Sequence, residues 1–251
     1  MPNYIAVSKE LHKNMFWKPV SNFSFAAQDS LCPIVIQEAP RAALHLPIAF
    51  SKMGDHFGLF VVQGFEPGSN YLVDAAGNWL AGYIPAAYRG FPFALTNAED
   101  QQVLCFDSDS GLINDNEGNT FFDETGEPST QIKQTLEFLS QVSQNHSVTQ
   151  ALCLLLEELE LLVPWPISIK KDDMDVSVDG LFCVDESKFN TLKVEDLATL
   201  RDKGVLALIY CQLISMQNLA RIDPGSKPEE LPLELPFDLP NDDGNISFEG
   251  L

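Results

Sequence analysis

Residues 58–93 read GLFVVQGFEPGSNYLVDAAGNWLAGYIPAAYRGFPF. The stretch begins inside an apolar run at 57–65 that is typical of a buried strand, and a Pro-Gly turn follows at 66–70. A short glycine-containing loop at 75–78 separates two further β-type runs, which predicts a hairpin. The stretch therefore predicts antiparallel strands in the N-terminal half of the chain. The expected hairpin strands are 71–73 and 79–84.

Outward from this stretch, strands and helices are segregated along the chain. Further β-branched runs predict strands at 33–37, 42–50 and 103–106, and a loop rich in Asp, Asn and Gly occupies 107–128. Strands that come first and helices that follow favour an α+β fold over a doubly wound parallel sheet. We therefore expect an α+β fold, with an antiparallel β-rich N-terminal half and a mostly helical C-terminal half.

The C-terminal half carries apolar residues at helical spacing. Ser129 is a candidate N-cap for a helix that ends at 144–146. Ser147 and Gln150 form a candidate capping box for a second helix, which the two prolines of 163–166 stop. A hairpin and two more helices complete this half. Their expected ranges are 166–185, 194–203 and 205–222.

The composition divides the chain into three parts. Residues 1–30 contain aromatics without a clean period and predict an irregular arm. Residues 31–222 hold the predicted strands and helices, which we assign to one domain. Its first part, 31–128, is predicted to be β-rich, and its second part, 129–222, to be helical with a hairpin. Residues 223–251 form an acidic, proline-rich tail.

The tail carries eight acidic residues and one lysine, and a proline stands at every fourth position from Pro224 to Pro240. Such a density of proline excludes helix and sheet and predicts an extended path of the polyproline type. Leucines and a phenylalanine alternate with the prolines and acids, which gives the strip an apolar face. Two interpretations stay open: the strip lies on its own domain, or it docks as a short motif in a partner's groove. The motif residues are Leu233, Leu235, Phe237 and Leu239.

The charge of the chain argues against several classes of partner. The 251 residues carry 36 acidic and 15 basic side chains, which gives a formal net charge of −21. Nucleic-acid binding requires a basic patch that releases counterions from phosphates, so we expect no nucleic-acid partner. The same repulsion disfavours an anionic membrane surface, and no apolar run reaches the length of a membrane span.

The five cysteines are scattered singly among apolar neighbours, without a Cys-x-x-Cys pair. This pattern is typical of buried thiols, and the odd number favours a reducing compartment. The first residues also lack the unbroken apolar core of a signal peptide. We therefore expect a cytoplasmic protein.

The sequence contains none of the common signatures of a catalytic or cofactor site. Gly-x-Ser-x-Gly, Gly-x-Gly-x-x-Gly and Gly-x-x-x-x-Gly-Lys-Ser/Thr are all absent, and no two histidines stand at the spacing of a metal pair. Residues 107–111 resemble the start of a calcium loop, but the glycine comes one position early and Gly118 stands where a bidentate glutamate is needed. We expect a hydrated acidic turn there, no metal and no cofactor. The histidines are His12, His45, His56 and His146.

The strongest candidate site surrounds Arg89, one of only four arginines in the chain. An arginine amid aromatic residues either stacks on a ring or holds a carboxylate in a bidentate pair. Two interpretations stay open: an ion pair that fixes this loop to the body, or a recognition surface for a peptide or small anion. The candidate binding residues are Trp79, Tyr83, Tyr88, Arg89, Phe91 and Phe93.

Five blocks of the sequence, taken together, resemble the SapC-like family of bacterial proteins. They are LVDAAGNWLAGYIPAAYRGFPFAL (72–95), VLCFDSDSGLI (103–113), FFDETGEPS (121–129), DGLFCVDESKFNTL (179–192) and GVLALIYCQLISMQNLARI (204–222). Their order and spacing agree with the family from about residue 33 to residue 222. The arm and the tail lie outside this resemblance.

The resemblance implies little chemistry, because the family has no established activity or catalytic residues to transfer. Its name derives from surface-layer gene clusters, and some members are labelled as peptide transporters, which this chain does not fit without a membrane span. Members are often encoded beside halogenase-like proteins, oxygenases and outer-membrane receptors. The resemblance therefore implies a soluble accessory protein linked to a modification or uptake system.

Three functions remain to be distinguished. The first is a non-enzymatic binding or accessory protein that engages a protein or peptide partner through the region 79–93 and the tail. The second is an enzyme of unrecognised type, in which Tyr83, Tyr88, Arg89 and the Asp185-Glu186 pair converge on a pocket. The third is assembly into a surface layer, which needs export and is disfavoured by the missing signal peptide.

Overall fold

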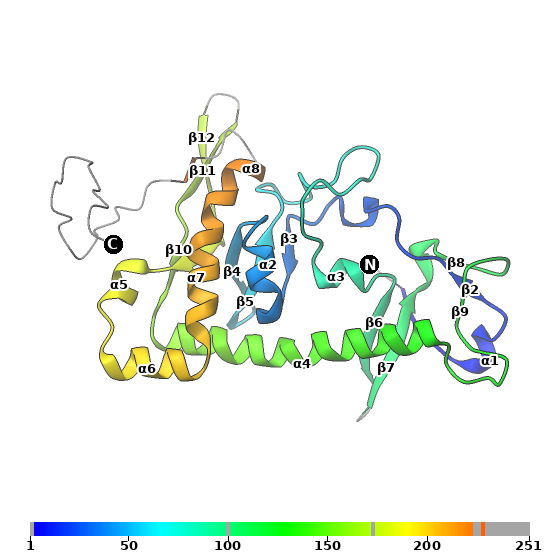
Figure 1. The fold of residues 1–251 in the computed structure, drawn as a ribbon. Helices are drawn as coiled ribbons and strands as arrows, with labels where there is room; N and C mark the ends of the chain where they lie inside the picture. Colours follow the sequence, from blue (N-terminus) through cyan, green and yellow to red (C-terminus); the bar gives the residue numbers. More distant parts are fainter. Residues whose placement is uncertain (1–2, 99–100, 172–173, 223–226, 229–251) are drawn as a thin grey trace, which may run out of the picture.

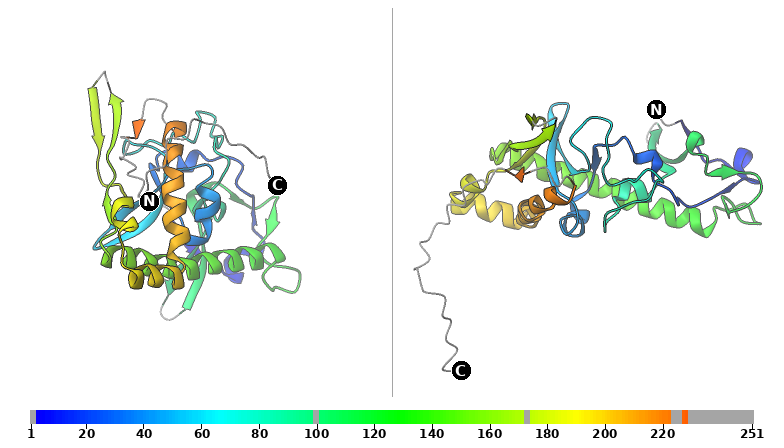
Figure 2. Two further views of the ribbon diagram at one scale, coloured as in Figure 1. Left: turned by 60° about the vertical axis from the view of Figure 1, so that its left-hand side comes forward. Right: turned by 90° about the horizontal axis from the view of Figure 1, so that it is seen from above.

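The computed structural model describes residues 3–98, 101–171, 174–222 and 227–228. One long helix, α4 (Thr130–Glu158), runs beneath two groups of strands (Figure 1). We call them the main lobe, which contains the five-stranded sheet, and the small lobe, which contains the N-terminal strand. Seen from above, the molecule is elongated along α4 (Figure 2).

The main lobe is built on an antiparallel five-stranded sheet. Its central hairpin closes through a two-residue loop that begins at Gly54, whose φ of 64° a glycine adopts without steric cost. In spatial order the strands are β10 (Leu162–Pro164), β13 (Phe182–Val184), β4 (Ile48–Met53), β5 (His56–Val62) and β3 (Leu31–Pro33).

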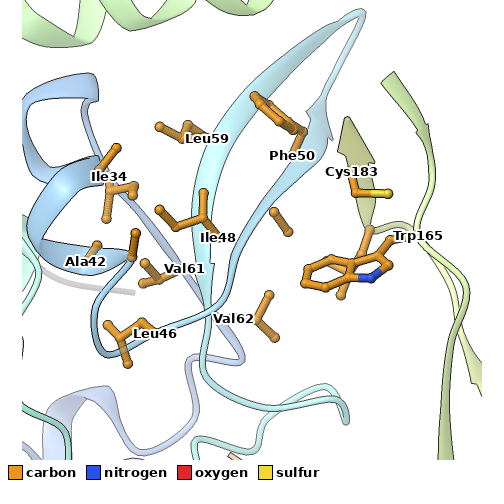
Figure 3. Close-up of a cluster of buried hydrophobic side chains, with 14 of the residues drawn as sticks. Ile34, Ala42, Leu46, Ile48, Phe50, Leu59, Val61, Val62, Trp165 and Cys183 are labelled. Atoms are coloured by element: carbon orange, nitrogen blue, oxygen red, sulfur yellow. The ribbon is translucent and has the colours of Figure 1, made fainter. Parts of the chain in front are cut away.

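The core of the main lobe lies on both faces of this sheet. Ile48 and Val61 point from β4 and β5 toward the segment that carries Ala42, and Trp165 lies on the side of β13 (Figure 3). Helix α7 (Val205–Ser215) packs against α2, β13 and β4, while α4 packs against β5. The other helical segments are α1 (Lys9–His12), α2 (Ala39–Ala42), α3 (Ala86–Arg89), α5 (Glu186–Asn190), α6 (Val194–Asp202) and α8 (Leu219–Ile222), with the 3-10 turns η1 (Ser24–Ala26), η2 (Ile36–Glu38), η3 (Ser108–Ser110) and η4 (Met216–Asn218).

A buried glutamine bridges the two neighbouring strands of the sheet that share the fewest residue pairs. Strands β13 and β4 share a single residue pair, Phe182 with Phe50. The side chain of Gln212 on α7 accepts a hydrogen bond from the Val184 amide at 3.0 Å and donates one to the Ile48 carbonyl at 3.3 Å. The polar residue that interrupts the apolar run of this helix therefore satisfies backbone groups that the sheet leaves unpaired.

The small lobe combines two three-stranded sheets on the other end of α4. Its core contains Trp17, Phe93, Leu104, Phe106, Phe121 and Ile132 of α4, separate from the core of the main lobe. In spatial order its strands are β1 (Tyr4–Ala6), β7 (Gln101–Asp107) and β6 (Phe93–Ala98) in one sheet, and β8 (Ile113–Asn114), β2 (Phe16–Trp17) and β9 (Asn119–Thr120) in the other.

The α+β class expected from the sequence is confirmed, since antiparallel sheets dominate the N-terminal half and helices the C-terminal half. The two helices expected on either side of Ser147 are wrong, because α4 is continuous. No proline or glycine interrupts it, and Thr149 donates a hydrogen bond to the Asn145 carbonyl one turn earlier, at 2.7 Å. The helix buries Ile132 in one core and Leu156 in the other, which requires its full length.

The hairpin expected at 71–73 and 79–84 is wrong, because the described chain has only an isolated bridge there, between Val73 and Trp79. The side chains of Asn70 and Asp74 accept hydrogen bonds from backbone amides in this stretch, which favours turns over strands.

The structure also differs from the prediction before residue 50. The strand expected at 33–37 is replaced by the end of β3 and by η2, and the first half of the strand expected at 42–50 belongs to α2 and the turn after it. Pro40 lies in the first turn of α2, where the missing amide proton costs nothing. Strand β4 then begins directly after Pro47.

The segment expected as an irregular arm contributes strands to the small lobe. β1 pairs with β7, and β2 stands between β8 and β9. The expected hairpin at 166–185 is present as β11 (Ile167–Lys171) and β12 (Met174–Val178), followed by β13 in the main sheet. Within the tail, only β14 (Lys227–Pro228) is described, and it pairs with β11. The candidate tail motif, Leu233 to Leu239, lies outside the described residues.

Candidate functional site

A buried glutamate organises the candidate site. Glu38, at the end of η2, is 6% exposed, and its carboxylate accepts three hydrogen bonds. The donors are the amides of Val35 at 3.1 Å and Ala86 at 2.6 Å, and the hydroxyl of Tyr83 at 2.7 Å. Because these donors satisfy the buried charge, Glu38 ties the start of α3 to the main lobe.

Arg89, at the end of α3, is held by the same network. Its Nε donates to the Ile84 carbonyl at 3.1 Å, and its Nη2 lies 3.4 Å from the Tyr83 hydroxyl and 3.6 Å from Glu38 Oε1. The guanidinium also lies over the ring of Phe138 on α4, 5.1 Å from its centroid. The side chain is nevertheless 44% exposed. Arg89 therefore fixes the loop to the body and still presents one edge to solvent.

The hydroxyl of Tyr88 belongs to a polar cluster in which Gln63 and Asn70 are buried and Asp29 is exposed. This hydroxyl donates to Asp29 Oδ2 at 3.0 Å and accepts from Gln63 Nε2 at 2.9 Å, and Gln63 in turn accepts from Asn70 at 3.1 Å. Burial raises the pKa of the Tyr88 hydroxyl, and the nearby Cys32 and Asp29 raise it further. Tyr88 therefore stays protonated at neutral pH and positions α3.

The remaining candidate aromatics divide between packing and the surface. Trp79 donates from Nε1 to the Tyr83 carbonyl at 2.9 Å and is half-buried. Phe93 is buried, edge-on to Trp17 with ring centroids 5.0 Å apart. Phe91 is stacked on Phe25 at 4.0 Å between centroids and is only partly buried. Of the predicted binding residues, Tyr83 contacts Arg89 and Trp79, and the Trp79 ring lies edge-on to Tyr88 with centroids 5.7 Å apart. The hydroxyl of Tyr88 has partners of its own.

A cleft of about 460 Å³ lies directly beside Arg89. Its walls come from the α3 segment, from the first half of α4 and from the chain after β2, three segments that are far apart in the sequence. We call it the Arg89 cleft. Its lining residues are Trp17, Pro19, Val20, Phe23, Ile84, Tyr88, Arg89, Gly90, Phe91, Phe93, Gln131, Gln134, Thr135 and Phe138.

The chemistry of the cleft wall is unlike the rest of the chain. Within the described residues the lining holds no Asp or Glu, although the chain carries 36 of them, and its one charged side chain is Arg89. Trp17 is 9% exposed, and its indole Nε1 is buried without a hydrogen-bond partner in the described part of the chain. The described part of the cleft wall is therefore aromatic, with Arg89 as its one charged side chain.

A second cavity, of about 540 Å³, lies on the other side of Tyr88 and Phe91. Asp107 in its wall accepts hydrogen bonds from the amides of Asn3 at 2.9 Å and Asp109 at 3.1 Å, which makes it the cap of η3. This is the acidic turn that resembles a calcium loop in the sequence. Across the described residues, no group of three or more His, Cys, Asp or Glu side chains is arranged to hold a metal ion.

The geometry weakens two features of the catalytic hypothesis. Burial raises the pKa of Tyr83, and the hydrogen bond to Glu38 raises it further, so neither Tyr83 nor Tyr88 is a base at neutral pH. Asp185, expected to converge with them, instead caps α5 by accepting from the Lys188 amide at 2.9 Å. It lies in the main lobe and does not line the cleft.

The cysteines supply no reactive nucleophile to the cleft. All five are free, and none lines it. Burial raises the pKa of Cys153 and of Cys183 to about 12, helped by Glu157 and Asp185 respectively, and burial also raises the pKa of Cys32. A thiol at such a pKa is almost entirely protonated at neutral pH and unreactive.

One stretch of the described chain, Val205–Ile222, is long and apolar enough to cross a membrane by length and composition. It comprises α7, η4 and α8. Within the fold 44% of it is buried, and Leu208 and Ile209 are fully buried. Core helices of folded domains have the same length and composition, so the stretch is weak evidence for a membrane span.

Comparison with known families assigns the chain to one family. The family model described as SapC matches residues 7–222. The chain belongs to the SapC family. The match begins at residue 7, so the SapC region includes most of the N-terminal segment, which the sequence resemblance leaves outside the family. No curated protein and no solved structure matches this SapC chain.

Glu38, Phe138 and Trp17 are absent from the set of site residues expected from sequence. Glu38 had no clear signal in the sequence: its side chain accepts from the Val35 amide three residues earlier, but Val35 is not the Ser or Thr that marks a capping box. Phe138 and Trp17 had none. They reach the Arg89 cleft only because α4 and β2 are packed beside α3 in the folded SapC domain.

Proposed function

We propose that this SapC protein is a non-enzymatic binding protein that engages a segment of a protein or peptide partner in the Arg89 cleft. The observation that carries the proposal is the cleft itself, a concave surface of aromatic rings around one arginine. Aromatic residues and arginine are the side chains enriched at protein interfaces and at their energetic hot spots.

The rigidity of Arg89 supports this proposal. Three groups, Ile84, Tyr83 and Glu38, hold the guanidinium before any partner arrives, and Phe138 supports it from below. A side chain that is already ordered loses less conformational entropy on binding than a free one. The network around Glu38 therefore improves a binding site as well as stabilising the loop.

The extent of the cleft supports a segment of chain as the occupant. Gln131 and Gln134 are exposed on α4 and line the Arg89 cleft, and their side-chain amides have no hydrogen-bond partner in the described residues. Each amide provides both a donor and an acceptor, which suits the main chain of an extended peptide. The aromatic rings supply apolar surface for its side chains.

The catalytic alternative requires a cleft beside Arg89 and a nucleophile or general base that faces it. The cleft is present, and the nucleophile or base is lacking in the described lining. The hydroxyls of Tyr83 and Tyr88 donate to the carboxylates of Glu38 and Asp29, so neither acts as a base. Within the described lining there is no Asp, Glu, His, Cys or Lys to act as nucleophile or general base. A binding function needs none of these groups.

The proposal includes a role as an accessory protein of a modification or uptake system and a location in the cytoplasm. The first rests on the family context, and the second on the five single cysteines of the sequence. Neither depends on the geometry of the Arg89 cleft.

A pull-down from native extract with matched variants tests the proposal. Arg89→Ala removes the arginine of the cleft. Arg201→Ala is the control, because Arg201 on α6 is 68% exposed and, among the described residues, pairs only with its neighbour Asp202. A partner retained by the wild type and by Arg201→Ala, and lost by Arg89→Ala, supports the proposal. A partner retained equally by all three proteins refutes this site. A chain that ends at Pro228 retains β14 and tests separately whether the tail motif contributes.

A further inference from the structure

We infer that the Arg89 cleft recognises a side-chain carboxylate, Asp or Glu, in an extended segment of a partner protein, with an apolar side chain of that segment packed beside it. This inference rests on the proposed function, which states only that a segment occupies the cleft. It adds the chemical class of the segment. The charge, the donors and the backbone of the cleft each support it.

The charge of the cleft selects for an acidic ligand. The chain carries a formal charge of −21, so most of its surface repels acidic segments. The lining of the Arg89 cleft, in the described residues, has no acidic side chain and one arginine. Arg89 is therefore the one charged group of the described lining, and it attracts a partner carboxylate.

The guanidinium has donors left for such a carboxylate. Arginine carries five N–H donors. Its Nε is engaged by Ile84 and its Nη2 approaches Tyr83, while Nη1 has no hydrogen-bond partner among the described residues. Glu38 does not saturate the charge either, because it lies 3.6 Å from Nη2 and is already bonded by three other donors. The outer edge of Arg89 thus remains available to a carboxylate.

The backbone beside Arg89 favours a side-chain carboxylate over a chain terminus. C-terminal carboxylates are captured by nests of free backbone N–H groups. Here the amides of Arg89, Gly90, Phe91 and Phe93 all donate to backbone carbonyls of the same loop, at 2.8–3.3 Å. Without free amides, the guanidinium is the group that recognises the anion, and a side-chain carboxylate reaches it without placing a chain end in the cleft.

The surroundings of Arg89 define the neighbouring contact. Phe138 lies under the guanidinium, and Phe91 and Trp17 also line the cleft. The Trp17 indole N–H is an unsatisfied donor in a wall residue that is more than nine-tenths buried. An apolar or aromatic residue adjacent to the acid would cover these rings.

The test uses the full-length chain and an array of synthetic octapeptides that are acetylated at one end and amidated at the other, so that no terminal charge is present. We expect the wild-type chain to retain peptides in which Glu or Asp adjoins an aromatic or aliphatic residue. Replacing that acid by its amide in the retained peptide should weaken binding by about 10- to 100-fold. This comparison needs no protein variant.

Protein variants then locate the effect. Arg89→Gln should abolish the preference for the acid, Arg89→Lys should keep part of it, and Arg201→Gln should behave as the wild type. If the wild type retains no peptide, the proposed function and this inference both fail. If peptides bind without a preference for acid, or if Arg89→Gln keeps that preference, the inference is overturned while the proposed binding function stands.

Discussion

Removing the carboxylate of Glu38 should destabilise the protein more than any surface acid does. Glu38→Ala deletes the acceptor of three hydrogen bonds, and two of the donors are backbone amides of the buried residues Val35 and Ala86. The third donor, Tyr83, is half-buried and can turn toward water. The main cost of the substitution is therefore two buried N–H groups without an acceptor.

The size of the loss follows from these contacts. An unsatisfied buried donor costs about 1–3 kcal/mol, and truncating one partner of a buried charge network costs about 3–5 kcal/mol. We expect a loss of about 3–5 kcal/mol for Glu38→Ala. Glu38→Gln keeps an oxygen for Ala86 and Tyr83 but opposes an N–H to the Val35 amide, so its loss should be about 1–3 kcal/mol.

Urea unfolding followed by circular dichroism measures both losses. Glu137→Ala is the matched control, because Glu137 is an exposed acid on α4 and should change the free energy of unfolding by less than about 0.5 kcal/mol. The reasoning is refuted if the free energies of unfolding of Glu38→Ala and of this control differ by less than about 1 kcal/mol, which is on the order of the scatter among surface substitutions. It is also refuted if Glu38→Gln costs more than Glu38→Ala.

Three further predictions test the helix, the thiols and the response to alkali. Val148→Pro should lower the free energy of unfolding by about 3 kcal/mol or more in the urea assay, because Val148 is exposed in the middle of α4 and proline breaks a helix interior. A helix that starts at Ser147 would tolerate proline at this position. An unchanged free energy would therefore restore the two-helix arrangement. Dithionitrobenzoate should label one thiol of the native chain quickly, that of Cys211, which is the least buried. Cys211→Ser should remove this fast phase of labelling. An unchanged fast phase would contradict the burial of the other four cysteines. Burial raises the pKa of Cys153 and Cys183 in the folded chain to about 12, against an ordinary 9.0, so their contribution to stability is fully present below pH 9 and is lost as the pH rises to about 12. The urea midpoint should therefore fall between pH 9 and about 12. It should fall less in the Cys153→Ala, Cys183→Ala double variant.

Much of the fold was predictable because its signals are local. The apolar run before the Pro-Gly turn at 66–70 identifies β5, and the order of strands and helices identifies the α+β class. The two β-type runs after the turn do not form the expected hairpin, and only Val73 and Trp79 pair there. The break expected at Ser147 was wrong because a capping sequence competes with helix continuation, and burial at both ends of α4 decided for continuation. Pro40, which lies between the strands expected at 33–37 and 42–50, stands in the first turn of a helix instead.

The candidate site was predictable only in part. Arg89 could be identified because an isolated arginine amid aromatic residues is visible in the sequence. Its partner Glu38 lies 51 positions away in sequence, and Phe138 lies on a helix with its own amphipathic pattern. In the described part of the chain no Asp or Glu lines the cleft, which is likewise a property of how three segments pack, so no local window of the sequence contains it.

The most direct test of the central claim, that a partner segment occupies the Arg89 cleft, is photo-crosslinking from its wall. Benzoylphenylalanine is placed at Gln134, which lines the cleft, and in a second protein at Glu195, which is exposed on α6 in the main lobe. We predict that illumination in native extract gives a discrete adduct from position 134 only, and that mass spectrometry maps it to an acidic and apolar segment of one partner. Adducts of the same partner from both positions, or none from position 134, would contradict the account.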